Sequence, residues 1–368
     1  RYISPTLFSY RERIQVNEEY ISREDFTRLA NRIARVIEEM KADGLPSPSP
    51  FEIETAISFL YFKEQKCDVV VLETGMGGLE DATNIITTSV MEILVSISRD
   101  HMGFLGNTLA EIASQKAGII KPSTCVITAH QEKEAMSVIR EKCRKENAVL
   151  YEVQDEDMSE IQYGLKEQRF LWHTEEGPRE IAIHLSGSYQ IENAKTALTA
   201  LRHMKEVGFP VSVSAVKKGM ARTQWRGRFT LLKEEPILLM DGAHNEDGAR
   251  MLCRSLKQYF SGKRIYYIVG MLADKEYEKV AAMTAPYACE VLTVETPDNP
   301  RALSSEDLAK VWKQYHSHVE ACTSIKQAVT KALQRAGKEE VIVAFGSLSF
   351  LGLLEKCVRD LPENIKNE

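Results

Sequence analysis

The sequence predicts an α/β protein with two doubly wound domains, at residues 1–225 and 226–368. Short apolar runs of strand length alternate with amphipathic helices along most of the chain, which is typical of parallel sheets. Two apolar runs end in charged residues beside glycines, and ligands bind at the carboxyl ends of strands in open α/β sheets. A chain of 368 residues also suits two domains of ordinary size.

Composition and charge limit the classes of function. The net charge of -6 and the sequence pI near 5.9 argue against a general nucleic-acid or anionic-membrane binder, so we expect small-molecule partners only. The seven cysteines are scattered without a Cys-x-x-Cys pair, which fits reduced thiols. No apolar run approaches the roughly 20 residues of a membrane span. We therefore expect a cytoplasmic protein, and a monomer.

The first domain is expected to open with two helices before strands begin to alternate with helices. Ser22 and Asp25 form an N-cap pattern, and Gly44 with three nearby prolines ends the helix that Ser22 opens. Thr108 and Glu111 form a capping box. The predicted helices are 22–40, 51–64, one that begins at 108 and one that ends near 146; the predicted strands are 69–73, 91–98, 124–128 and 148–153.

The alternation stops at residues 155–188, where short charged and aromatic runs predict a β-hairpin at an antiparallel sheet edge. A long helix, 190–207, ends at Gly208-Phe209-Pro210. The second domain then restarts the alternation, with predicted strands at 237–241, 265–269, 290–294 and 341–345. Its predicted helices are 247–259, one from 275, 304–314, 324–335 and one opened by Gly346-Ser347.

Polar side chains follow two predicted strands of the first domain. Glu73 ends the run Val-Val-Val-Leu and enters a glycine-rich turn, and Asp100-His101 follows the next strand. Lys116, near the end of the next helix, should reach the same rim. Taken singly, a Glu at a strand end is as often a solvated loop residue or a cap partner, and an Asp-His pair is as often a structural hydrogen bond. Their joint spacing favours a functional site at the carboxyl ends of the predicted strands.

The second domain carries its own polar strand end, Asp241-Gly242-Ala243-His244-Asn245, and a turn at Gly346-Ser347. Asn245 and Ser347 are more readily explained as helix N-caps. Together with Arg228, this segment places a cation, an acid and an imidazole near the domain junction, where ligands are commonly bound.

These motifs, in this order, resemble the folylpolyglutamate synthase and dihydrofolate synthase family of the Mur ligase superfamily. The segments that carry the resemblance are Leu72-Glu73-Thr74-Gly75-Met76-Gly77-Gly78, Asp81-Ala82-Thr83-Asn84, Asp100-His101, Gln115-Lys116-Ala117-Gly118, Arg226-Gly227-Arg228 and Asp241-Gly242-Ala243-His244-Asn245. The resemblance implies a Mur-ligase-like central domain of the P-loop NTPase type and a Rossmann-like C-terminal domain. It also implies an ATP-dependent ligase that adds L-glutamate to a reduced folate, or to dihydropteroate, through an acyl phosphate.

The resemblance also implies roles for individual residues. Ser4, Glu73 and His101 would bind Mg²⁺, and Lys116 would be carbamylated by CO₂, since a plain lysine cation would repel the metal. The predicted ATP contacts are Asn193, Arg228 and Asp241, and the predicted pterin contacts are Phe51 and Glu52. The remaining residues predicted to be catalytic are Asp81, His244 and Ser347.

Three departures from the family pattern stand out. The family's phosphate-binding loop lies upstream of Ser4 and nothing in residues 1–368 replaces it, so we expect an N-terminally incomplete chain. Thr6 stands where the family usually has histidine, and Leu79 stands where it has arginine, which affects pterin recognition. Two alternatives are a different Mur-type amino-acid ligase and a catalytically dead relative that acts as a binding protein.

Overall fold

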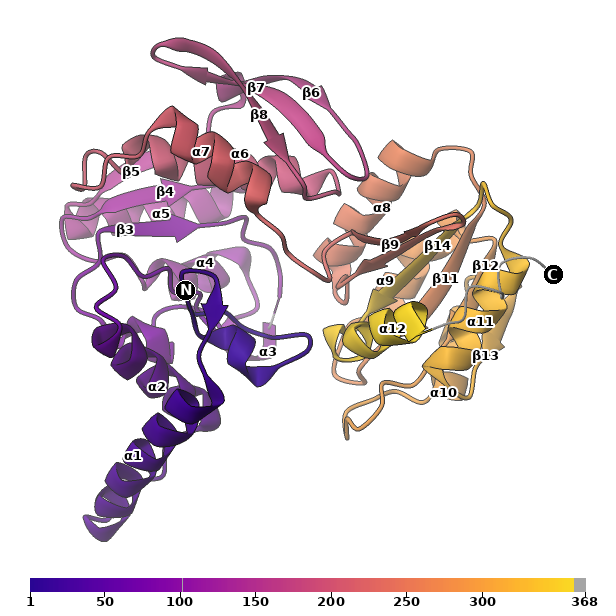
Figure 1. Ribbon diagram of the computed structural model, residues 1–368, viewed down its shortest axis with the longest axis horizontal. Helices are drawn as coiled ribbons and strands as arrows, with labels where there is room; N and C mark the ends of the chain where they lie inside the picture. The colour runs from indigo at the N-terminus through magenta and orange to yellow at the C-terminus, as the bar shows by residue number, and fades with distance from the viewer. Residues whose placement is uncertain (101, 361–368) are drawn as a thin grey trace. The chain divides into compact units, whose positions relative to one another are not determined.

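The computed structural model describes residues 1–100 and 102–360, which form two compact units, Arg1–Glu152 and Val153–Glu368 (Figure 1). Parallel and antiparallel sheets with flanking helices make up both units, so the predicted α/β class is confirmed. None of the helices in the described ranges is both long enough and apolar enough to cross a bilayer.

The first unit contains a small parallel sheet with the strand order β3-β4-β5. The strands are β3 (Met91–Leu94), β4 (Cys125–Thr128) and β5 (Val149–Glu152), close to the predicted ranges. Helices α4 (Leu109–Ala117) and α5 (Lys133–Glu146) share a buried core with β3 and β4. The capping box of Thr108 and Glu111 opens α4 as the sequence predicts.

Two long helices and the N-terminal segment form a second core in this unit. Helix α1 (Arg23–Ala42) begins after the N-cap Ser22, and α2 (Pro50–Glu64) begins after the capping box of Ser49 and Glu52; the two helices lie side by side in Figure 1. The smaller elements are η1 (Tyr10–Arg13), the hairpin β1 (Gln15–Val16) and β2 (Glu19–Tyr20), η2 (Ala82–Ile85) and α3 (Met102–Leu105).

The prediction of a strand at residues 69–73 is wrong. The segment is extended, but its pairing is a single parallel bridge between Tyr2 and Leu72. Backbone hydrogen bonds run from Tyr2 N to Val71 O (2.9 Å) and from Glu73 N to Tyr2 O (2.9 Å). A strand needs a continuous ladder, and here the side chain of Val71 is 66% exposed rather than buried in a sheet.

The second unit begins with a separate antiparallel sheet in place of the predicted sheet edge. Its strands are β6 (Met158–Gln162), β7 (Gln168–Thr174) and β8 (Gly177–Ile183), in the order β6-β7-β8. Helix α6 (Tyr189–His203) covers this sheet, and α7 (Val213–Arg222) shares the same core. The hairpin prediction captured β7 and β8 but not the third strand.

A six-stranded sheet with the order β13-β12-β11-β14-β10-β9 completes the unit. Only β9 is antiparallel to its neighbour. The strands are β9 (Thr230–Glu234), β10 (Ile237–Asp241), β11 (Ile265–Gly270), β12 (Glu290–Thr293), β13 (Val319–Ala321) and β14 (Val341–Gly346). The sequence predicted four of them and missed β9 and β13.

Helices lie on both faces of this sheet, which is why its two central strands β11 and β14 are buried along their whole length. Helices α8, α9 and α10 share one large core with β10, β11 and β14, and α11 and α12 contact the same strands. The helices are α8 (Glu246–Phe260), α9 (Tyr277–Thr284), α10 (Ser305–Trp312), α11 (Ile325–Arg335) and α12 (Leu348–Asp360), and a short turn, η4 (Ala285–Tyr287), follows α9.

Candidate active site

Glu73 and Ser4, two of the predicted metal ligands, lie together in the first unit. The Tyr2–Leu72 bridge aligns the two segments, and the backbone N–H of Ser4 donates a hydrogen bond to Oε2 of Glu73 (2.8 Å). Glu73 is exposed, so its carboxylate is accessible to a ligand. The third predicted ligand, His101, lies outside the described residues. Metal binding by all three stays a prediction.

Asp81 holds the glycine-rich turn that follows Glu73. Its Oδ2 accepts hydrogen bonds from the backbone N–H groups of Gly75 and Met76 (both 2.8 Å), and its Oδ1 accepts from Thr83 N (3.0 Å) and Thr83 Oγ1 (2.7 Å). Four donors on one carboxylate fix the shape of the turn. This geometry supports a positioning role for Asp81, and its predicted catalytic role stays untested.

The glycine turn packs closely against the end of α4, the helix that carries Lys116. A Cβ atom on Gly78 would lie 2.8 Å from the carbonyl oxygen of Lys116 and 2.9 Å from that of Gln115. The N–H of Leu79 donates to the same Gln115 carbonyl (2.7 Å). The turn is thus built against the backbone that carries Lys116, and residue 78 must be glycine.

A Gly78→Ala variant should therefore be less stable by about 1–3 kcal/mol, because the added methyl group would overpack against two backbone carbonyls that cannot rotate away. Thermal unfolding of the variant would measure the change. Gly219→Ala is the matched control, since a Cβ there meets open space within helix α7, and it should be neutral or slightly stabilising. Equal melting temperatures for Gly78→Ala and the parent protein would contradict the packing argument.

Lys116 lies in the last turn of α4 and is half-buried. Burial lowers the pKa of its amine, and the carboxylate of Asp100 opposes part of that shift. The neutral form of the amine is therefore more populated than in an exposed lysine. Asp100 follows strand β3 and Lys116 lies on α4, a helix between β3 and β4, so the two residues belong to one βα unit.

The two predicted pterin contacts begin helix α2. The ring of Phe51 packs on the glycine turn, because a Cβ on Gly75 would lie 2.5 Å from the ring. Glu52 completes the helix cap by accepting from Ser49 N (2.7 Å). A cavity of about 410 Å³ opens beside them; its lining is Glu52, Thr55, Ala56, Phe59, Leu79, Glu80, Asp81, Ala82, Asn84 and Ile85.

In the second unit, Asp241 ends strand β10 and is only 4% exposed. Its Oδ2 accepts from Tyr189 Oη (2.8 Å) and Phe229 N (2.8 Å), and its Oδ1 accepts from Ala243 N (2.9 Å). Burial raises the pKa of this carboxyl, while nearby Arg228 and the hydrogen bonds act in the opposite direction. The side chain of Arg228 covers Gly242 at the same strand end.

His244 and Ser347 follow the neighbouring parallel strands β10 and β14, so the structure places both residues at the carboxyl ends of the strands. Nδ1 of His244 lies 2.7 Å from the carbonyl oxygen of Gly242, and because a carbonyl only accepts, Nδ1 carries the proton. Ser347 donates its N–H to Gly270 O (2.7 Å), and its Oγ accepts from Ser349 N (3.2 Å). Asn245 caps α8, as predicted.

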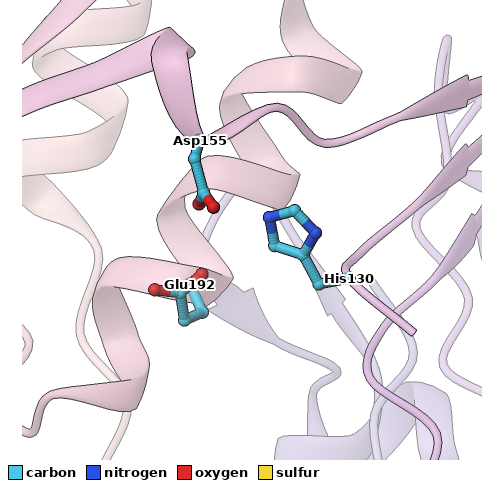
Figure 2. Close-up of side chains that lie close together, drawn as sticks. All are labelled: His130, Asp155 and Glu192. Atoms are coloured by element: carbon cyan, nitrogen blue, oxygen red, sulfur yellow. The ribbon is translucent and has the colours of Figure 1, made fainter. Parts of the chain in front are cut away.

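The remaining predicted ATP contact, Asn193, is exposed on α6 and donates to Gln190 Oε1 (2.9 Å). Figure 2 shows two carboxylates from the same unit, Asp155 and Glu192. Both pair with the buried amine of Lys195, at 2.8 and 3.3 Å. This pairing accounts for the two acids without a metal ion. His130, also labelled in Figure 2, belongs to the first unit.

Sequence reasoning missed Tyr189, whose hydroxyl binds Asp241. Its only sequence signal is its place at the start of α6, four residues before Asn193, and aromatic residues at helix starts are too common to single it out.

Comparison with known proteins shows that the chain contains two Mur ligase domains. Residues 30–201 match the model of the Mur ligase middle domain, and residues 227–348 match that of the Mur ligase glutamate ligase domain. The two matches lie on either side of the predicted boundary at 225/226, whereas the compact units of the structure meet at 152/153. The domain boundary therefore stays a prediction.

The individual relatives narrow the class to one family. The chain is 34% identical to a dihydrofolate synthase/folylpolyglutamate synthase of Bacillus subtilis, over 97% of this chain and 83% of that protein. A folylpolyglutamate synthase of Mycobacterium tuberculosis complexed with ADP and AMPPCP matches 98% of this chain and 85% of that one, with a TM-score of 0.87 and 27% identity. An FPGS–AMPPCP–folate complex matches 96% of this chain and 82% of that one, with a TM-score of 0.81 and 27% identity. The chain belongs to the folylpolyglutamate synthase and dihydrofolate synthase family.

Proposed function

We propose that this protein is an ATP-dependent ligase that joins L-glutamate to the carboxylate of a reduced folate, and of dihydropteroate as well. The substrate carboxylate attacks the γ-phosphate of ATP, ADP leaves, and the glutamate amine then displaces phosphate from the acyl phosphate. The observation that carries the proposal is the match to both Mur ligase domains, together with 34% identity to a dihydrofolate synthase/folylpolyglutamate synthase over 97% of this chain.

The first unit supplies the groups that would hold Mg²⁺. A carboxylate from Glu73 and a hydroxyl from Ser4 are oxygen donors of the kind that Mg²⁺ prefers, and the hydrogen bond between the two residues fixes their separation. When bound, the ion would neutralise phosphate charge, and the protein's contribution to phosphoryl transfer is chiefly positioning and charge balance. Asp81 maintains the turn that orients Glu73.

Lys116 is proposed to react with CO₂. Its neutral amine attacks the carbon of CO₂, a C–N bond forms, and one proton is released, which leaves a carbamate anion. The lowered pKa of Lys116 favours the nucleophilic neutral form, and the carbamate would reverse the sign of the charge that this residue presents to a metal and to phosphate.

The second unit supplies the remaining groups. Arg228 is a cation beside the end of β10 and would contact the nucleotide, together with Asn193 and the Asp241 turn. Nε2 is the basic nitrogen of the neutral His244 ring, because Nδ1 is the donor to Gly242. We propose that this nitrogen accepts a hydrogen bond or a proton from the incoming amine.

The cavity beside α2 is proposed to hold the pteridine end of the folate. Glu52, Glu80 and Asp81 line it. The Asp81 carboxylate is already held by four donors of the turn, so Glu52 and Glu80 are the acids suited to accept hydrogen bonds from the amino and ring N–H groups of a pteridine. Phe59 and Leu79 provide apolar contact for the ring. A monomeric state and a cytoplasmic location stay predictions.

The protein should hydrolyse ATP to ADP and phosphate only when L-glutamate and either a reduced folate or dihydropteroate are supplied together, because the acyl phosphate needs both substrates to turn over. Product analysis by ion-exchange chromatography would measure the nucleotide, and mass spectrometry would detect a folate heavier by one glutamate. AMP with pyrophosphate in place of ADP would reject the mechanism. ATP turnover without a glutamylated product would favour the alternative of a different Mur-type ligase.

A further inference from the structure

Asp241 is held by donors from three different segments. Tyr189 reaches it from the start of α6, Phe229 from the segment before β9, and Ala243 from the turn after β10. Both carboxylate oxygens are therefore occupied by protein donors, at 2.8–2.9 Å. A buried carboxylate held in this way fixes the backbone around it.

Among the donors to Asp241, the Phe229 amide links this carboxylate to Arg228, because Arg228 is the preceding residue. By accepting from Phe229 N, Asp241 fixes the backbone that carries the Arg228 guanidinium. The carbonyl of Phe229 is also held, as the acceptor of Ser186 Oγ (2.6 Å). Gly242 leaves room for Arg228, since a Cβ on Gly242 would lie 2.3 Å from Nη1 of Arg228. Arg228 is thus placed by the strand end and the preceding turn together.

Tyr189 closes this arrangement from the other side. It is partly buried and packs against the core of the six-stranded sheet. Burial raises the pKa of its hydroxyl well above the ordinary value, so the group stays a hydrogen-bond donor at neutral pH. Without that donor, the Oδ2 atom of Asp241 would keep only the Phe229 amide in a site closed to water.

We propose that Tyr189 is a positioning residue of the nucleotide site: its hydroxyl fixes the Asp241 carboxylate and, through it, the backbone that presents Arg228. The inference rests on the proposed function, in which Arg228 contacts ATP. Because Asn193 lies one turn further along the same helix, the Tyr189–Asp241 hydrogen bond also fixes the start of α6 relative to the end of β10.

A Tyr189→Phe variant tests the proposal, because it removes one hydroxyl and keeps the ring. We expect the Kd for AMPPCP and the KM for ATP to rise about tenfold, the change typical for a lost hydrogen bond to a charged group, with kcat within about threefold of the parent value. Combining Tyr189→Phe with Arg228→Gln should be little worse than Arg228→Gln alone, since both act through one group. Asp241→Asn should show the same loss of affinity for AMPPCP, and it replaces Tyr189→Phe as the test if Tyr189→Phe folds poorly.

Tyr259→Phe is the matched control. Its hydroxyl donates to the neutral Gln168 side chain (2.9 Å), and its ring packs against Phe229 with centroids 5.3 Å apart. Tyr259→Phe should lose as much thermal stability as Tyr189→Phe but keep the parent affinity for AMPPCP. In combination with Arg228→Gln, its loss of thermal stability should add to that of Arg228→Gln. Parent affinity in Tyr189→Phe alongside a weakened Arg228→Gln would overturn the inference alone. Parent affinity in Arg228→Gln would overturn the nucleotide assignment as well.

Discussion

A Lys116→Ala variant is expected to be nearly inactive and to regain activity when a short-chain carboxylic acid is added. The truncation removes the carbamate but leaves space at the end of α4, where a small carboxylate can supply the missing negative charge. Loss of an electrostatic group at a phosphoryl-transfer site typically lowers kcat by about 10²–10³-fold. Steady-state rates with and without added acetate or propionate would measure both the loss and the rescue.

The control for this prediction is Lys142→Ala. Lys142 also lies near the end of a helix and pairs with Glu146 four residues on (2.6 Å), so its loss should leave the rate unchanged and unresponsive to added acid. The carbamate itself can be observed by ¹³C NMR after addition of labelled bicarbonate. A carbamate signal should require Mg²⁺, because an anion at a helix C-terminus is disfavoured by the helix dipole. No signal and no rescue would exclude carbamylation.

Replacing Glu73 by Gln should lower turnover at least about tenfold, the cost expected when a metal site loses one anion. The substitution is nearly isosteric, and the amide oxygen of Gln can still accept the hydrogen bond from Ser4 N. The fold should therefore remain while the charge is lost. The concentration of Mg²⁺ required for half-maximal rate should rise accordingly, and titration of the rate with MgCl₂ would measure it.

Glu64→Gln is the control for the loss of one carboxylate charge, because Glu64 lies at the surface and pairs there with Arg28 and Arg32. Its Mg²⁺ dependence should match that of the parent. If Glu73→Gln retained the parent rate at limiting Mg²⁺, Glu73 would not be a metal ligand.

Much of the secondary structure could be predicted because local signals fixed it. The cap residues Ser22, Thr108 and Asn245 open helices where the sequence places them, since an N-cap acts within one turn. Strands β9 and β13 were missed because each lies at an edge of the six-stranded sheet, where the hydrophobic pattern is weaker than in a strand with two neighbours. The 69–73 segment failed for a different reason: its apolar run predicts a buried strand, but pairing depends on distant residues.

The candidate site was predictable where its residues follow strands. His244 and Ser347 lie at one sheet edge because β10 and β14 are parallel neighbours, a consequence of the alternating pattern even though strand order was not predicted. The partners of the acids could not be predicted. Asp241 binds the Tyr189 hydroxyl and the Phe229 amide through tertiary structure, and no spacing along the chain encodes those contacts. The donors to Asp81 are within six residues of it, but side-chain types in a turn do not say which backbone N–H groups will point at the carboxylate.

The single bridge between Tyr2 and Leu72 has a consequence for how the site forms. It joins residues about 70 positions apart, and closing a loop of that length costs about 4 kcal/mol in chain entropy. That cost is offset by the core around Tyr2, which is fully buried with Ile14 and Ile57. The proximity of Ser4 and Glu73 thus depends on a hydrophobic core rather than on a local motif. Amide hydrogen exchange at Glu73, whose N–H is bonded to Tyr2, therefore reports the fraction of molecules in which the two segments are joined.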